Sequence, residues 1–116
     1  PYIMHPFRVM LDVSDRVERV VAILHDVLED CPSIRPIDLI NDGISDAAVV
    51  ACEMLNKKNF PDYATYIDNI AQFGYPAFNV KLADLRDNMG VRDLKNVDEN
   101  KTKYQKAYNT LIRSLQ

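Results

Sequence analysis

Apolar residues recur at intervals of three and four along most of the chain, which is the spacing of one face of an α-helix. The clearest stripe consists of Val17, Val20, Val21, Leu24 and Leu28. Just before this stripe, Asp15 is followed three residues later by Glu18, a capping-box pattern that marks the start of a helix. The pattern therefore predicts a helix that begins after Asp15, continues through Leu28 and buries one face.

Residues that favour helix ends recur along the rest of the chain. Those suited to a first turn or an N-cap are Pro6, Pro36, Ser45, Pro61 and Pro76, and those suited to a helix end are Gly43, Gly74 and Gly90. A last helical stripe follows Asp98. No turn of the Asn-Gly type lies between alternating apolar runs, so nothing indicates a β-hairpin. We predict an all-α fold with six or seven helices in one compact domain that spans residues 1–116.

Composition supports a single soluble domain. The chain has 116 residues, of which 47% are apolar and 27% charged, which is enough to form one core of ordinary size. Its apolar runs are far shorter than the roughly 20 residues of a membrane span, so we expect no membrane partner. Cys31 and Cys52 are too few for a disulfide framework, which predicts free thiols and a cytoplasmic location.

The charge balance excludes one class of partner. Fourteen Lys and Arg residues stand against 17 Asp and Glu residues, for a formal net charge of −3. A broad basic surface for duplex nucleic acid is therefore not expected. A small phosphate-bearing substrate remains compatible with this balance if a metal ion or a few local cations compensate its charge. The sequence specifies no oligomeric state.

The two histidines of the chain, His5 and His25, lie close to carboxylates. His25 is followed by Asp26, Glu29 and Asp30, which on one helix would form a polar strip beside the apolar stripe. Such groups are costly to bury unless they are paired, and a divalent cation would pair them. An imidazole with carboxylates is a mixed nitrogen and oxygen ligand set that suits Mn²⁺, Fe²⁺ or Zn²⁺.

A second polar cluster occurs at residues 81–88. Asp84 and Asn88 are four residues apart and project together, with Lys81 on the same side, whereas Asp87 is predicted to face solvent. His5, His25, Asp26 and Asp84 together would fill four positions of an octahedral ion. A lone histidine on a helix is, however, more often a surface residue or a satisfied core residue. Spacing alone leaves a metal site and a set of unrelated polar residues both open.

These residues resemble the motifs of HD-domain phosphohydrolases in their order and spacing. The matching segments are Pro1-Tyr2-Ile3-Met4-His5-Pro6, His25-Asp26-Val27-Leu28-Glu29-Asp30, and Lys81-Leu82-Ala83-Asp84 with Asn88. The His…His-Asp…Asp pattern is common to the HD superfamily. The Glu-Asp pair one turn later and the Lys-Leu-Ala-Asp…Asn string are more similar to the hydrolase domain of the Rel/SpoT family and to stand-alone small alarmone hydrolases.

This resemblance implies an all-α HD fold that binds one Mn²⁺ ion through His5, His25, Asp26 and Asp84. It also implies hydrolysis of the 3′-pyrophosphate of guanosine tetra- or pentaphosphate, which releases GDP or GTP and pyrophosphate. Manganese would lower the pKa of a bound water and polarise a phosphoryl oxygen. Glu29 and Asp30 would orient that water, accept its proton, or both.

The resemblance implies further contacts to the nucleotide. Asn88 would hydrogen-bond the ribose or phosphate region, Lys57 and Lys81 would attract phosphates, and Tyr108 or Tyr104 would pack by the base. Lys81 as a plain surface charge is an equally open interpretation. Members of the family carry a helix with basic residues before the Pro-Tyr-Ile stretch. The sequence begins at Pro1, which leaves open both a trimmed chain and a domain without those contacts.

Two alternatives follow from these observations. The first is an HD hydrolase of another nucleotide or phosphoester, with the same metal and a different pocket. The second is a catalytically inert nucleotide-binding regulatory module. Turnover of guanosine tetraphosphate with Mn²⁺, measured against a panel of nucleotides, separates the first from an alarmone hydrolase. Tight nucleotide binding without product would indicate the second.

Overall fold

The computed structural model describes the backbone at residues 4–90 and 97–116 and the side chains at 4–90 and 102–116. Over these residues the chain is helical and contains no β-strand. The elements are α1 (Met4–Leu11), α2 (Arg16–Leu24), α3 (Val27–Asp30), α4 (Pro36–Asn41), α5 (Asp46–Met54), the 3-10 helix η1 (Lys57–Asn59), α6 (Tyr63–Phe73), α7 (Ala77–Asn88) and α8 (Val97–Ser114). The all-α prediction is confirmed, and seven of these α-helices have six or more residues.

The predicted helix starts depend on local capping. The Asp15 side chain accepts a hydrogen bond from the Glu18 amide, and Glu18 reaches back to the Asp15 amide, which completes the capping box of α2. Ser45 caps α5 with a single hydrogen bond, which its side chain accepts from the amide of Ala48. Asp62, rather than Pro61, caps α6. The first turn of each of these three helices is therefore satisfied by a side chain next to it in the sequence.

The long helix predicted from Asp15 through Leu28 is wrong in one respect. The structure divides it into α2, which ends at Leu24, and the single turn α3, which begins at Val27. His25 and Asp26 form the junction between them, and their backbones keep near-helical dihedral angles. Leu28, the last residue of the predicted apolar stripe, is still buried beyond the junction.

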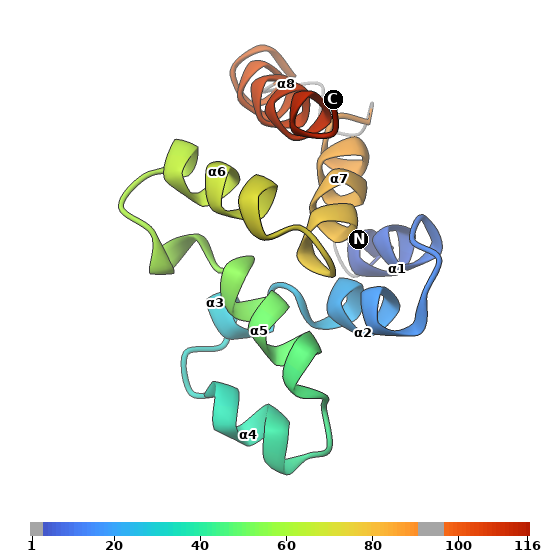
Figure 1. Cartoon of the computed structure of the whole chain (residues 1–116), viewed down its shortest axis with the longest axis vertical. Coiled ribbons are helices and arrows are strands. Elements are labelled where there is room, and N and C mark those ends of the chain that lie inside the picture. Colours follow the sequence, from blue (N-terminus) through green and yellow to red (C-terminus); the bar gives the residue numbers. More distant parts are fainter. Residues whose placement is uncertain (1–3, 91–96) are drawn as a thin grey trace.

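Helix α7 is the centre of the structure. It packs against α1, α2, α5, α6 and α8, and eight of its twelve residues are buried. Figure 1 shows α7 beside the α1–α2 pair, with α6 next to it and α8 across both. Lys81 and Asp84 are buried on this helix because neighbours cover it on several sides. The helix carries two charged side chains into the interior, and the interior must compensate them.

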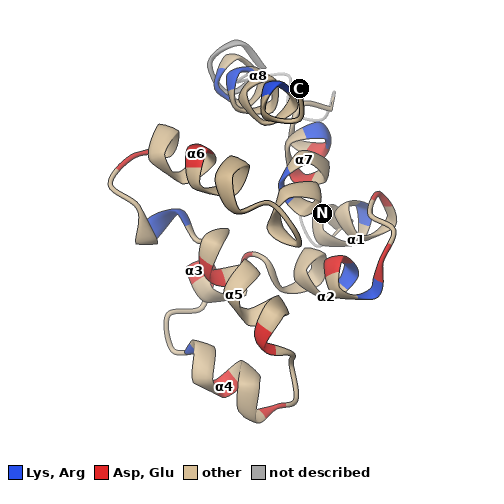
Figure 2. Ribbon diagram, in the orientation of Figure 1, with Lys and Arg blue, Asp and Glu red and all other residues tan. Residues whose placement is uncertain are grey.

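Charged segments are distributed over several helices. Figure 2 shows acidic and basic residues interspersed on the ribbon, with acidic segments around α3 and basic segments on α8. None of the helices in the described ranges has both the length and the apolar composition that crossing a membrane requires.

Leu111, in the last turn of α8, and Leu115, just after its end, are a matched pair that tests the packing of this helix. Leu111 is fully buried, whereas Leu115, one turn later, is 66% exposed. We expect Leu111→Ala to lower the free energy of unfolding by about 2–5 kcal/mol, because it leaves a cavity in the core. Leu115→Ala should change it by no more than about 0.5 kcal/mol. Urea unfolding measures both, and equal effects of the two substitutions would contradict the described packing.

Candidate metal centre

Three distant segments of the chain meet at one cluster of histidines and aspartates. His5 lies in the first turn of α1, His25 and Asp26 lie at the α2–α3 junction, and Asp84 lies on α7. They meet because α7 packs against both α1 and α2. The four predicted metal ligands are therefore brought together, although 79 residues separate His5 from Asp84 in the sequence.

His25 presents one ring nitrogen to the cluster. Its Nδ1 donates a hydrogen bond to the carbonyl oxygen of Ala22 at 2.6 Å, so the lone pair of the neutral ring is on Nε2. This buried Nε2 atom has no hydrogen-bond partner among the described residues. It lies 3.4 Å from Oδ2 of Asp26 and 3.5 Å from Oδ1 of Asp84. A buried lone pair between two carboxylates is a position that suits a cation.

His5 contacts a carboxylate at each ring nitrogen. Nε2 lies 2.7 Å from Oδ1 of Asp84, and Nδ1 pairs with Asp87. A neutral imidazole has one N–H, so it cannot donate to both carboxylates. Either a second proton or a metal ion must lie between one nitrogen and its carboxylate. Burial lowers the pKa of His5, but the hydrogen bonds to Asp84 and Asp87 outweigh it and raise this pKa above its ordinary value.

Asp87 does not face solvent as predicted. Its side chain is only 13% exposed and pairs with His5, and its Oδ1 accepts a 2.7 Å hydrogen bond from Nε of Arg8. The prediction failed because it treated α7 as an isolated helix, whereas α1 covers this side of it. A carboxylate on the far nitrogen of a histidine ligand fixes the ring and its tautomer. The sequence feature that could have indicated this contact is Arg8, which is three residues after His5 and so lies on the same face of α1.

The buried carboxylate of Asp84 accepts hydrogen bonds from one cationic and one neutral neighbour on its own helix. Its Oδ2 accepts a 2.8 Å hydrogen bond from Nζ of Lys81, and its Oδ1 accepts one of 3.3 Å from the Asn88 amide. Burial raises the pKa of Asp84, but Lys81 and the two histidines lower it by more than burial raises it. The pKa of Asp84 therefore lies well below its usual range. Lys81 is therefore a buried partner of Asp84 and not a surface charge, and its ammonium lies 5.0 Å from the Tyr66 ring centre.

The geometry of the cluster fits a metal ion. One ligand atom each from His5, His25 and Asp26 lies within 4.8 Å of the others. Ligand atoms at about 2.0–2.2 Å from one ion lie no more than roughly 4.4 Å apart, so small movements would bring these atoms to bonding distance. The orphaned Nε2 of His25 and the two-sided contacts of His5 are both satisfied by such an ion.

A polar cavity of about 240 Å³ adjoins the cluster. Its lining includes the predicted catalytic residues Glu29 and Asp30. The other lining residues are His25, Asp26, Leu55, Lys57, Tyr63, Tyr66, Lys81, Asp84, Asn88 and Tyr104. Nζ of Lys57 lies 4.0 Å from Oε1 of Glu29, whose side chain is 14% exposed. His5 contacts the cluster from α1 and is not among the residues that line this cavity. The other predicted site residues share the cavity, with one exception.

The exception is Tyr108, which is not among the residues that line this cavity. Its hydroxyl instead accepts a hydrogen bond from the guanidinium of Arg86. Burial lowers the pKa of Arg86, but the hydrogen bonds to Asp12 and Tyr108 raise this pKa above its ordinary value. Tyr104 lies one helical turn earlier on α8 and does line the cavity. The α8 stripe predicted both tyrosines on one side of the helix, but it did not specify which of them reaches the site.

Comparison with models of known protein families gives no match, and comparison with curated proteins gives none either.

Removing the charge of Asp87 tests the contact that orients His5. We expect Asp87→Asn to weaken Mn²⁺ binding by about 10–100-fold, because the ring loses the carboxylate that fixes its tautomer. Asp12→Asn is the matched control, since Asp12 pairs with Arg86 at an exposed site, outside the cluster. Isothermal titration calorimetry measures both variants. The same affinity for the two variants would contradict an orienting contact.

The raised pKa values of His5 and His25 predict how the metal-free protein responds to pH. For His25, burial lowers the pKa, but Asp84, Asp26 and the Ala22 carbonyl raise it by more. Because these pKa values are higher in the folded than in the unfolded protein, protonation of the two histidines stabilises the fold. This stabilisation is complete below the unfolded histidine pKa of about 6.5 and is lost as pH rises through the raised pKa values of the folded protein. With EDTA present, Tm should therefore fall from pH 6 to pH 9.

His25→Gln is the control for this pH dependence and should flatten it. A saturating metal ion should reverse the sign, because metal ions and protons compete for the same nitrogens. A rise in Tm of the metal-free parent across this range would contradict the described histidine environments.

Proposed function

We propose that this protein is a metal-dependent phosphohydrolase of the HD type. Its substrate would be a nucleotide, and the proposed reaction removes the 3′-pyrophosphate of guanosine tetra- or pentaphosphate. The observation that carries the proposal is the orphaned Nε2 of buried His25, beside His5 and Asp26, at the wall of a cavity lined by Glu29. A cation site beside a buried carboxylate is an arrangement that suits hydrolysis of phosphate esters.

The proposed cofactor is Mn²⁺, held by His5, His25, Asp26 and Asp84. Two imidazoles with two carboxylates form a mixed ligand set that favours manganese, iron or zinc over magnesium. When bound, the ion would acidify water and polarise a phosphoryl oxygen. Lys81 would keep the Asp84 carboxylate ionised and oriented, because its ammonium is 2.8 Å from Oδ2 of that residue.

Glu29 is the proposed general base. Its side chain is mostly buried and lines the same cavity as Asp26 and Asp84, so a water in the cavity is within its reach. The water oxygen would bond to phosphorus, Glu29 would accept the proton, and the bond from phosphorus to the 3′-oxygen would break. The leaving oxygen would gain a proton and become the ribose hydroxyl. Asp30 lines the cavity next to Glu29 and would help to orient the water.

Other residues of the cavity would hold the substrate. Lys57 is half exposed and lies near Glu29, so its ammonium would attract a phosphate at the mouth of the cavity. The Asn88 amide already donates to Asp84, and its other N–H would be available to the ribose or phosphate region. Of the two tyrosines that the resemblance offers for packing against the base, Tyr104 lines the cavity and would take that role.

A paired substitution tests the assignment of the base. We expect Glu29→Gln to retain Mn²⁺ and the fold but to lower kcat by about 10²–10⁴-fold, because the proton acceptor is lost. Asp26→Ala should instead lose the metal ion. Glu53→Gln, on α5 and outside the cavity lining, is the control and should behave like the parent. Turnover of guanosine tetraphosphate with Mn²⁺ and calorimetric metal titration measure the two effects.

The same assay, extended to a panel of nucleotides, distinguishes the proposed substrate from its alternatives. Release of GDP and pyrophosphate from guanosine tetraphosphate supports the proposal. Turnover of another nucleotide alone would replace the substrate but keep the reaction. Tight guanosine nucleotide binding without any product at saturating Mn²⁺ would contradict an enzyme and indicate a regulatory module. Parent-like turnover by Glu29→Gln would contradict the role of Glu29.

A further inference from the structure

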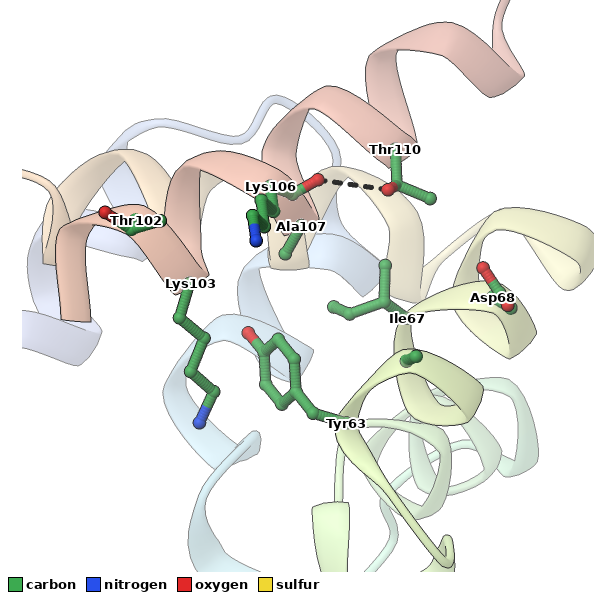
Figure 3. Close-up of a pocket in the computed structure, with 9 residues that line it drawn as sticks. Tyr63, Ile67, Asp68, Thr102, Lys103, Lys106, Ala107 and Thr110 are labelled. Atoms are coloured by element: carbon green, nitrogen blue, oxygen red, sulfur yellow. Dashed lines mark hydrogen bonds between the residues drawn. The ribbon is translucent and has the colours of Figure 1, made fainter. Parts of the chain in front are cut away.

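A second cavity, of about 450 Å³, lies between α6 and α8. Its floor is apolar, with Ala64 and Ile67 from α6 and Ala107 from α8. Its edge is basic, because Lys103 and Lys106 project from α8. Figure 3 shows Lys103 extending from α8 on one side of the Tyr63 ring, with Ile67 on the other side of it. We call this cavity the α6–α8 groove.

The α6–α8 groove adjoins the polar cavity at Tyr63, which lines both. Nζ of Lys103 lies 4.2 Å from the Tyr63 ring centre, and Nζ of Lys81 lies 5.9 Å from it. The Tyr63 hydroxyl is buried and has no hydrogen-bond partner among the described residues. The Tyr63 ring therefore forms the wall between the polar cavity and the groove, and its hydroxyl is available to a ligand in either of them.

The charges that line the polar cavity would balance one another once a divalent ion is bound. Four of its lining residues are carboxylates: Asp26, Glu29, Asp30 and Asp84. Lys57, Lys81 and one divalent ion would carry four positive charges, so the cavity with its ion would be neutral. A phosphate monoester brings about −1.5 to −2 charges at neutral pH. A substrate with several phosphates therefore needs cations beyond this lining.

The α6–α8 groove supplies such cations. Its lining contains Lys103 and Lys106 against one carboxylate, Asp68, which leaves a net positive charge. Residues 102–116 contain no acidic side chain, and no described carboxylate forms an ion pair with either lysine. Burial lowers the pKa of Lys103, and the positive charges of Lys57 and Lys81 lower it as well. The ammonium groups of Lys57, Lys81 and Lys103 therefore repel one another. An anion among them would relieve that repulsion.

We propose that the α6–α8 groove is a second anion subsite, which binds the part of the substrate remote from the reacting phosphorus. This inference rests on the proposed phosphohydrolase function and narrows the substrate class to molecules with two separated phosphate-bearing ends. One end reacts at the metal cluster, and Lys103 and Lys106 bind the phosphates of the other. The apolar floor at Ile67 and Ala107 packs against the portion that joins them. Lys103 and Lys106 are thus specificity-determining residues.

Equilibrium binding tests the subsite without turnover. The probes are guanosine tetraphosphate, which has two phosphate-bearing ends, and p-nitrophenyl phosphate, which has one, each titrated by calorimetry into the EDTA-treated protein. We expect Lys103→Gln and Lys106→Gln each to weaken tetraphosphate binding by about tenfold, as loss of a charge-assisted contact does. Arg113→Gln, on the same helix but outside the groove lining, is the matched control and should bind like the parent.

Steady-state kinetics with Mn²⁺ provide a second readout. The Lys103→Gln/Lys106→Gln double variant should raise KM for the tetraphosphate by about 10–100-fold and leave kcat/KM for p-nitrophenyl phosphate unchanged. The inference is overturned if the double variant binds tetraphosphate as the parent does, or if Arg113→Gln weakens binding equally. It is also overturned if the parent binds the tetraphosphate no tighter than p-nitrophenyl phosphate. If binding follows the lysines but no phosphoester is hydrolysed, the subsite stands and the proposed function fails.

Discussion

Burial of the Asp84 carboxylate at the centre of the helical core is the constraint on which the rest of the structure depends. A buried carboxylate is costly unless cations and hydrogen-bond donors surround it. Here Lys81 on its own helix, His5 from α1 and His25 from the α2–α3 junction meet that need. Since those partners come from three segments, the compensation of one charge also holds α1, α2 and α7 in their relative places.

The same compensation leaves too few protons for the ring nitrogens and carboxylates that meet there. His5 contacts an aspartate on each side, and Nε2 of His25 lies near the same Asp84 oxygen and near Oδ2 of Asp26 without a hydrogen bond. A single metal ion at this cluster would satisfy these contacts. The cluster adjoins the polar cavity, and that cavity adjoins the basic groove, so the three lie in sequence across α7, α6 and α8. The charges around Asp84 are therefore connected, through the polar cavity, to the basic groove in which we propose that an anion binds.

Much of this arrangement could be predicted from local sequence signals. Helix ends at Asp15, Ser45 and Gly74 follow from capping chemistry, which depends on a few neighbouring residues. The residue types offered His5 and Asp84 as ligands of one ion, but their spacing also left a set of unrelated polar residues open, because convergence depends on tertiary packing. Asp87 was predicted in solvent and lies instead against His5, because helix periodicity carries no information on which neighbour covers a face. Lys103 was missed because an exposed lysine has no distinguishing pattern until Tyr63 is placed beside it.

Anomalous diffraction from crystals grown with Mn²⁺ tests the central claim most directly, since it locates the ion and its ligands in one experiment. The account predicts one strong peak, within about 2.0–2.3 Å of Nε2 of His5, Nε2 of His25 and carboxylate oxygens of Asp26 and Asp84. Density at the cluster without an anomalous peak, or a peak bound only elsewhere on the surface, would contradict it.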